Sequence, residues 1–512
     1  MFEWVDVPFE WLSSLLGVPG DIIKIPFCLL CSYPFSGILK RLPQAPLLRN
    51  AFCILIGLIY LIPVHHLTTG TYVLLFDALF TYFTAALVRT SYMPWIVFLV
   101  ILGHTFYSHV IRYVYPSDRN DITASQMVLC MKLTAFAWSV HDGRQAENAL
   151  SEYQKQRRLK KIPNLLFFLG YVFFFPSVLV GPAFDYVDYE HFITLSMFDH
   201  PRDPMETQIT PHSLKPALGR CWRGVLWHIG FLFGTSLFPL SFLLGREFAS
   251  FSLLKKYGYV IITVFIARMK FYGAWELSDG ACVLSGIGYN GVDELKRPRW
   301  DRVKNIDPIG FEFASNIKGA LEAWNMNTNK WLRNYVYLRV AKKGKRPGFK
   351  STLSTFTVSA LWHGVSPGYY MTFVSAAFIQ TIAKYHRRFF RPFFLQPDMK
   401  TPGPFKKVYD IVGIVATNLS VSYLIVSFLL LTLNESIYVW SNLHFLVHIY
   451  TILCIVVFNS PVKAKLNKVL KKRTEKAEFE TYKTQTNFSD NDMVNMSIPD
   501  PEDFTLAPST SK

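Results

Sequence analysis

Charge is scarce in this chain, and polar linkers are missing from most of its length. Only 17% of its 512 residues are Asp, Glu, Lys or Arg, against roughly a quarter in an average soluble protein. By contrast, 51% are apolar and 16% are aromatic. The apolar residues form repeated blocks with Trp and Tyr near their ends, a pattern typical of membrane interfaces. The sequence therefore predicts an all-α, polytopic membrane protein rather than a set of soluble domains.

Several motifs that define other protein classes are also missing. The N-terminus has no basic region followed by a cleavable apolar core, so we expect no signal peptide. There is no His-Glu-x-x-His zinc pattern, no Gly-x-x-x-x-Gly-Lys-Ser/Thr phosphate loop and no haem-attachment pattern. The seven cysteines are scattered, and the C-x-x-C formed by Cys28 and Cys31 lies in an apolar run. We expect membrane packing there, no metal site and no tightly bound cofactor.

The formal net charge of +17 comes from Lys and Arg in short loops beside apolar segments. In a soluble protein this charge would indicate nucleic-acid binding. Here positive loops facing the cytosol are the simpler interpretation, with anionic lipid or a polyanionic co-substrate as partners. We expect no nucleic-acid partner.

About eleven segments are apolar enough to cross or re-enter a bilayer. The first is short and interrupted by Pro26 and Pro34, which favours a re-entrant segment. The polar residues 474–512 are short of apolar clusters, so we expect a disordered tail after a membrane domain of residues 1–473. The predicted segments are 22–39, 51–63, 72–87, 93–110, 126–140, 164–180, 225–244, 257–269, the run 351–383, 412–433 and 443–458.

The rest of the chain is organised around residues 321–383. Residues 351–383 contain no Asp, Glu, Lys or Arg, and His363 is the one side chain there that exchanges a proton near neutral pH. A lone His in a membrane span is more often a buried hydrogen-bonding group than a catalyst. The apolar flank with Trp362 favours a neutral ring that accepts a proton, and Gly364 leaves space beside it. His363 is therefore a candidate general base.

Two further groups could take part in acyl transfer. If the fold brings it close, the Asn325 amide could donate to a developing oxyanion or hold a carbonyl. The string 364–368 fits Gly-x-Ser-x-Gly, but that motif places its nucleophile on a strand-to-helix turn of an α/β sheet, so a turn is the simpler interpretation for Ser366. Direct attack by an acceptor hydroxyl, deprotonated by His363, is simpler than a covalent acyl-enzyme.

A basic loop, residues 342–350, lies between Asn325 and His363 in the sequence. It is either a topological anchor or a grip on the phosphates of coenzyme A. Its basic residues are Lys342, Lys343, Lys345, Arg346 and Lys350.

These residues carry a resemblance to a known family. The strings 324–326 (Trp-Asn-Met), 329–332 (Asn-Lys-Trp-Leu) and 361–364 (Leu-Trp-His-Gly) resemble the signature of membrane-bound O-acyltransferases. The resemblance extends to the lysophospholipid acyltransferase branch, above all its broad-specificity fungal members of the endoplasmic reticulum. It covers nearly the whole chain except the tail, through residues 126–144, 181–186, 271–291, 300–350 and 359–370.

The resemblance implies a helical fold that encloses a reaction tunnel, with acyl-CoA entering from the cytosol and the lysophospholipid from the bilayer. The family's catalytic His and Asn fall on His363 and Asn325. The implied acceptors are lysophosphatidylcholine, lysophosphatidylethanolamine, lysophosphatidylserine and lysophosphatidic acid, in the endoplasmic reticulum membrane. Candidate substrate-binding residues are Trp324, Asn329, Trp331, Tyr337, Lys343, Arg346 and Trp362.

Two alternatives stay open. Another branch of the same family would acylate a sterol, a diacylglycerol or a protein. A membrane transporter would use the basic loops and membrane carboxylates for flux, although the sequence lacks the paired half-repeats that transporters often show.

Overall fold

The computed structural model describes residues 2–116, 121–198, 211–341, 348–396 and 398–486. Helices dominate this part of the chain, and its β structure is limited to two isolated bridges. The chain divides into unit 1, Met1–Thr381 with Gly413–Thr451, and unit 2, Ile382–Val412 with Ile452–Lys512. Every candidate site residue that the structure describes lies in unit 1.

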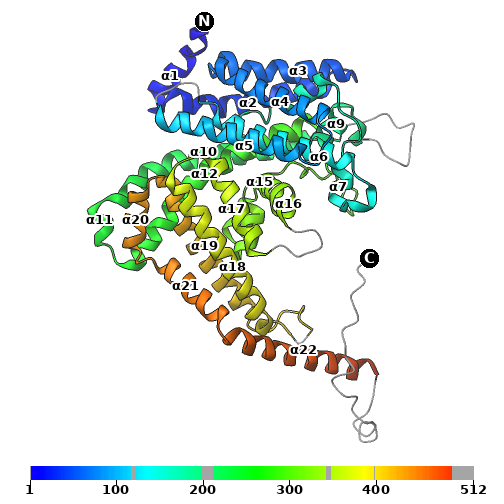
Figure 1. Ribbon diagram of the computed structural model, residues 1–512. Helices are drawn as coiled ribbons and strands as arrows, with labels where there is room; N and C mark the ends of the chain where they lie inside the picture. Colours follow the sequence, from blue (N-terminus) through cyan, green and yellow to red (C-terminus); the bar gives the residue numbers. More distant parts are fainter. Residues whose placement is uncertain (1, 117–120, 199–210, 342–347, 397, 487–512) are drawn as a thin grey trace, which may run out of the picture. The chain divides into compact units, whose positions relative to one another are not determined.

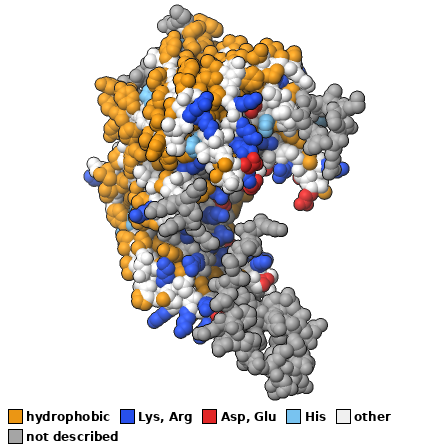
Figure 2. Space-filling view, turned by 45° about the vertical axis from the view of Figure 1, so that its right-hand side comes forward, with side chains coloured by type: hydrophobic (Ala, Val, Ile, Leu, Met, Phe, Trp, Pro, Cys, Tyr) orange, Lys and Arg blue, Asp and Glu red, His pale blue; other side chains and the backbone are white. Residues whose placement is uncertain are grey.

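Four apolar helices follow the short α1 (Val7–Leu16) in unit 1: α2 (Gly20–Arg41), α3 (Pro46–Ile59) with the π-helical turn η2 (Tyr60–Val64), α4 (Thr68–Leu87) and α5 (Met93–Val114). Their outer faces carry exposed Leu, Phe and Tyr side chains, and Figure 2 shows hydrophobic side chains over much of the visible face. The re-entrant segment predicted at 22–39 is wrong. The helix α2 is continuous through both prolines, as transmembrane helices tolerate when neighbouring groups satisfy the freed backbone.

The next helix, α6 (Thr123–Gly143), is the centre of unit 1. Nearly all its residues are buried, and both α4 and α5 pack against it (Figure 1). Because protein surrounds it on all sides, α6 tolerates Lys132, Ser, Thr and Gln among its apolar residues. It is therefore a core helix as well as one of the predicted membrane segments.

The region that follows α6 differs from our expectation of a span at 164–180. Only a short helix forms there, α8 (Leu165–Val172), and turns follow it as far as Val180. Its apolar residues are nevertheless buried, Phe168, Tyr171 and Phe174 completely. Burial by protein therefore explains a run that looks like a membrane span. The flanking helices α7 (Glu152–Arg157) and α9 (Tyr186–Ile193) are short.

Two long helices, α10 (Leu214–Leu237) and α12 (Leu253–Ser285), pack against each other. The prediction that one span ends at residue 269 is wrong, because α12 continues for sixteen more residues through the Gly-rich stretch. Ion pairs join them: Arg223 to Glu276 at 2.8 Å and Arg220 to Asp279 at 2.7 Å. These two carboxylates therefore have a structural explanation, the joining of α10 to α12.

The remaining helices include those that carry the candidate site residues. They are α11 (Arg246–Ser250), α13 (Pro308–Glu312), α14 (Ile317–Ala323), α15 (Met326–Trp331), the π-helical turn η6 (Leu332–Tyr337), α16 (Leu338–Val340), α17 (Phe349–His363), α18 (Pro367–Phe389), α19 (Lys406–Leu430), α20 (Leu433–Asn442), α21 (Leu446–Asn459) and α22 (Val462–Thr486). Short 3₁₀ segments are η1 (Glu3–Val5), η3 (Glu147–Ala149), η4 (Ser196–Phe198), η5 (Leu240–Leu244) and η7 (Arg391–Phe394).

The all-α membrane architecture agrees with the prediction, but the count of eleven segments is not confirmed. In the described ranges, six helices are long and apolar enough to cross a membrane, or seven if α20 and α21, bent by 81°, form one span. The helix α22 runs past residue 473, where we expected the membrane domain to end. Residues 487–512 of the predicted tail lie outside the described residues.

Candidate active site

One face of α6 holds the segment that follows Asn325. The Thr328 hydroxyl lies 3.2 Å from the Met131 sulfur, the Trp331 indole donates to Thr134 Oγ1 at 2.9 Å, and Arg339 pairs with Asp142. Each of these three pairs is separated by 197 residues. Because the separation is constant, α15, η6 and α16 run beside α6 in the same direction (Figure 1).

The same face of α6 also holds the end of α17. The indole N–H of Trp362 donates to the Met127 carbonyl at 2.9 Å, and the Trp362 and Trp331 rings lie 6.0 Å apart. Met127 and Met131 are one helical turn apart, about 6 Å along the axis. The structure therefore brings the segments that carry His363 and Asn325 to adjacent turns of α6.

His363 is the last residue of α17, and its side chain is half-buried. Its ring stacks on Phe373 at 5.0 Å and meets Phe428 edge-on at 5.0 Å, with Tyr369 at 5.6 Å. Within the described residues, no group hydrogen-bonds the ring. An imidazole with apolar walls and no hydrogen-bond partner among the described residues is suited to accept a proton.

Asn325 precedes α15 in a left-handed conformation, with φ +40° and ψ +56°. Asn is one of the few residue types that adopt this conformation readily. The turn is held by the Met326 N–H, which donates to the Asn305 carbonyl at 2.7 Å. The Thr328 hydroxyl donates to Asn325 Oδ1 at 2.8 Å, and within the described residues no group accepts from the NH₂ of this half-buried amide.

The other predicted substrate-binding residues divide into four groups. Trp331 and Trp362 are buried, and their indole N–H groups donate to α6. The contacts of Trp324 are with aromatic rings of α12 and α13, among them Trp275 at 5.1 Å and Phe311 at 5.1 Å. Asn329 and Tyr337 are half-buried, and the Asn329 amide donates to the Leu321 carbonyl at 3.0 Å. Lys343 and Arg346 lie outside the described residues.

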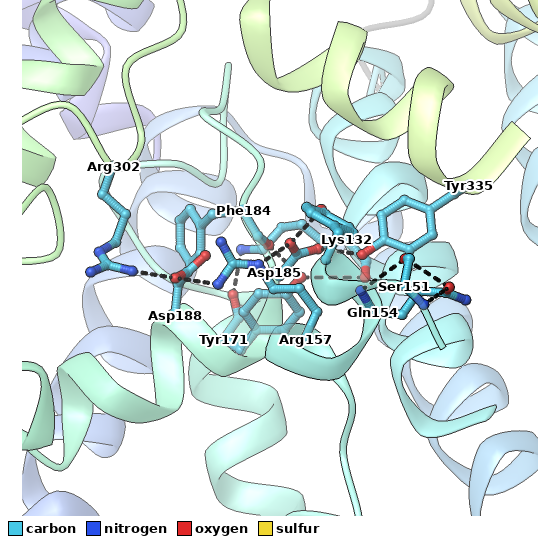
Figure 3. Close-up of polar contacts among 11 residues, drawn as sticks. Lys132, Ser151, Gln154, Arg157, Tyr171, Phe184, Asp185, Asp188, Arg302 and Tyr335 are labelled. Carbon is cyan, nitrogen blue, oxygen red and sulfur yellow. Dashed lines mark hydrogen bonds and ion pairs between the residues drawn. The ribbon is translucent and has the colours of Figure 1, made fainter. Parts of the chain in front are cut away.

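A buried polar network secures the middle of the Asn325 segment (Figure 3). The Tyr335 hydroxyl donates to Asp185 Oδ1 at 2.8 Å, and Tyr153 donates to Oδ2 of the same carboxylate at 3.0 Å. Arg157 lies between Asp185 and Asp188, at 3.1 Å and 3.0 Å. Burial raises the pKa of the Asp185 carboxyl, and the Arg157 guanidinium opposes that rise. The network ties η6 to α7 and α9.

Ser366 lies in the short connection between α17 and α18. Its carbonyl accepts the Tyr369 N–H at 3.1 Å, and the Gly368 N–H donates to Leu431 at 2.8 Å. Helices flank it on both sides, so the strand that the Gly-x-Ser-x-Gly motif requires is absent from this part of the described structure. Ser366 thus lies in the turn that we expected.

Comparison with known proteins identifies the family. The sequence profile of the membrane-bound O-acyltransferase family (MBOAT) matches residues 119–426. The chain is 71% identical to a lysophospholipid acyltransferase of Schizosaccharomyces pombe, over 98% of both chains. The chain belongs to the membrane-bound O-acyltransferase family. It is also 40% identical to a lysophospholipid acyltransferase of Saccharomyces cerevisiae, over 94% of this chain and 80% of the yeast protein.

More distant members of the family match most of the chain as well. Membrane-bound glycerophospholipid O-acyltransferase 2 of Homo sapiens is 28% identical, over 88% of this chain and 87% of the human protein. Within this MBOAT protein, α6 lies inside the matched range, as do both segments that it holds. The resemblance seen in the sequence is therefore confirmed at the level of the family.

Several residues that hold this MBOAT site together could not be predicted from the sequence. His109, whose ring Nε2 lies 3.1 Å from the Trp362 carbonyl, comes from a different helix. Thr328, Asp142 and Arg339 act through contacts between residues far apart in sequence. The signal that was available is the polar string at the end of an apolar run, residues 141–144, which marks Asp142 as unusual without revealing its partner.

Proposed function

We propose that this protein transfers a fatty acyl chain from acyl-CoA to the free hydroxyl of a lysophospholipid, making a diacyl phospholipid. Family membership and similarity to two lysophospholipid acyltransferases over most of this chain support this reaction. The observation that carries the mechanism is the placement of the His363 and Asn325 segments on adjacent turns of α6. A free imidazole and a free amide NH₂ are the groups that a direct acyl transfer needs.

The reaction requires one base and one oxyanion donor. The His363 ring accepts the proton of the lysophospholipid hydroxyl as its oxygen forms a bond to the thioester carbonyl carbon. The Asn325 NH₂ donates to the carbonyl oxygen while negative charge builds up there. When the intermediate collapses, the carbon–sulfur bond breaks, and the leaving sulfur takes the proton from His363. The products are the diacyl phospholipid and CoA with a free thiol, and the enzyme regains its starting state.

The substrates bind at different places in this proposal. Acyl-CoA binds from the cytosolic side, with its phosphates near the basic residues Lys343 and Arg346, and Asn329 and Tyr337 belong to the same binding region. The lysophospholipid comes from the bilayer of the endoplasmic reticulum. We propose a broad headgroup range that includes choline, ethanolamine, serine and the unsubstituted phosphate.

A panel assay tests this function. Purified protein is incubated with lysophospholipids of the four headgroups and acyl-CoAs of several chain lengths, with products read by mass spectrometry and CoA thiol release measured in parallel. We expect one CoA released for each diacyl phospholipid formed. Product from a sterol or a diacylglycerol alone would show that the acceptor is different. Substrate flux across vesicles without acyl-CoA consumption would favour the transporter.

A further inference from the structure

The helix that carries His363 ends abruptly. Gly364 has φ +127° and ψ −159°, a conformation that is essentially restricted to glycine. As a result, the chain leaves the helix directly after His363. A Cβ at position 364 would also lie 3.1 Å from both Cγ and Nδ1 of His109. Glycine is therefore required here for its backbone conformation and for the close approach of the His109 ring.

His109 comes from α5 and completes the end of α17. The last four carbonyls of a helix have no partner inside the helix. In α17 the Ala360 carbonyl accepts the Gly364 N–H at 3.1 Å, and the Trp362 carbonyl lies 3.1 Å from Nε2 of the buried His109 ring. A carbonyl oxygen can only accept, so His109 Nε2 carries a proton and donates it. One side chain of α5 thus caps the residue next to His363.

His363 has few other means of orientation. Its described neighbours are aromatic rings, which restrict the tilt of the imidazole but do not hydrogen-bond it. In many enzymes a carboxylate or carbonyl orients the catalytic His directly, and no described residue does so here. The position of the His363 backbone therefore determines where the ring nitrogen lies.

We propose that His109 is a positioning residue for His363, whose Nε2–H holds the Trp362 carbonyl and thereby fixes the imidazole relative to the acceptor hydroxyl. This inference rests on the proposed role of His363 as the general base. Misplacement of a reacting group by about 1 Å can cost roughly 10²-fold in rate. Loss of the His109 donor should therefore lower kcat about 10- to 100-fold, while KM for either substrate changes little.

The donor can be tested with three variants of similar size. The amide nitrogen of Gln reaches the position of histidine Nε2, whereas that of Asn reaches the position of Nδ1. His109→Gln should therefore retain most of kcat, and His109→Asn and His109→Leu should both lose it. Replacement of His191 by Leu is the control, because the side chain of His191 is exposed although α9 itself is mostly buried. Each variant is purified, checked for monodispersity and tested for acyl-CoA binding.

The outcomes separate this inference from the proposed function. Wild-type kcat in both His109→Asn and His109→Leu would overturn the positioning role. A His109→Gln protein as slow as His109→Leu would also overturn it, since the donor alone would then be insufficient. If His109→Leu does not fold, the comparison of Gln with Asn decides. High turnover by His363→Ala would instead refute the proposed function, whatever the His109 variants show. With His363→Ala inactive, slow Asn and fast Gln variants support the inference.

Discussion

Breaking the ion pair between Asp142 and Arg339 should destabilise the segment that carries Asn325. The two arginine nitrogens lie 2.9 Å and 2.5 Å from the two carboxylate oxygens, and the side chains are 4% and 14% exposed. The guanidinium also lies 4.1 Å from the centre of the Trp138 ring. This is the last of the three contacts that keep the segment in register with α6. It also immediately precedes the basic loop.

The expected cost follows from burial. Asp142→Asn keeps the shape of the side chain but leaves the guanidinium buried without a counter-charge, which typically costs about 3–5 kcal/mol. Arg339→Gln leaves the carboxylate in the same position and should cost a similar amount. Because α16 leads into the basic loop, we also expect a higher KM for acyl-CoA in both variants. KM for the lysophospholipid should change less.

The assay compares thermal unfolding and steady-state kinetics of the single variants with those of a charge exchange, Asp142→Arg with Arg339→Asp. The exchange should regain part of the unfolding temperature, since it restores opposite charges. The matched control is Glu152→Gln, which removes an exposed partner of Lys155 at 2.7 Å and should change little. The importance of this pair would be refuted if the single variants unfold at the wild-type temperature and the charge exchange unfolds no higher than the single variants.

Three further predictions concern Asn325, the C-terminal tail and the basic loop. Asn325→Ala should lower kcat roughly 10²–10³-fold, and Asn325→Asp at least as much, because it replaces a donor with negative charge; wild-type turnover by the Asp variant would remove Asn325 from the chemistry. A chain that ends at Thr486 should keep most of its activity in detergent; a folded but inactive truncation would show that the tail reaches the site. Neutralising the basic loop should raise KM for acyl-CoA and weaken the dependence on ionic strength, whereas unchanged kinetics would make it a topological anchor; the substituted residues are Lys342, Lys343, Lys345 and Arg346.

Hydrophobic patterning predicts the helices that face lipid. The segments 51–63, 72–87 and 93–110 correspond to α3, α4 and α5, because long apolar runs there are enforced by the bilayer. The same signal fails where protein replaces lipid. The run 164–180 is apolar because it fills the core. The two carboxylates of α12 are ion-paired with α10, and they interrupt the apolar pattern of what is a single long helix.

The candidate site is only partly visible in the sequence. His363 stands out because it is the one titratable group of an uncharged run, and Asn325 because of the motif around it. His109, Thr328 and Arg339 give no such signal. Their roles come from contacts between helices, such as the constant separation of 197 residues between α6 and the Asn325 segment, and these depend on the packed fold.

The central claim is that His363 is the general base of a direct acyl transfer. The most direct measurement compares purified wild-type protein with His363→Ala in two assays. Turnover is followed as diacyl phospholipid by mass spectrometry, and acyl-CoA affinity is measured by equilibrium binding. General base catalysis contributes roughly 10²–10⁴-fold. We therefore predict a loss of turnover of that size with acyl-CoA binding close to wild type. A monodisperse His363→Ala protein that makes diacyl phospholipid at nearly the wild-type rate would contradict the account.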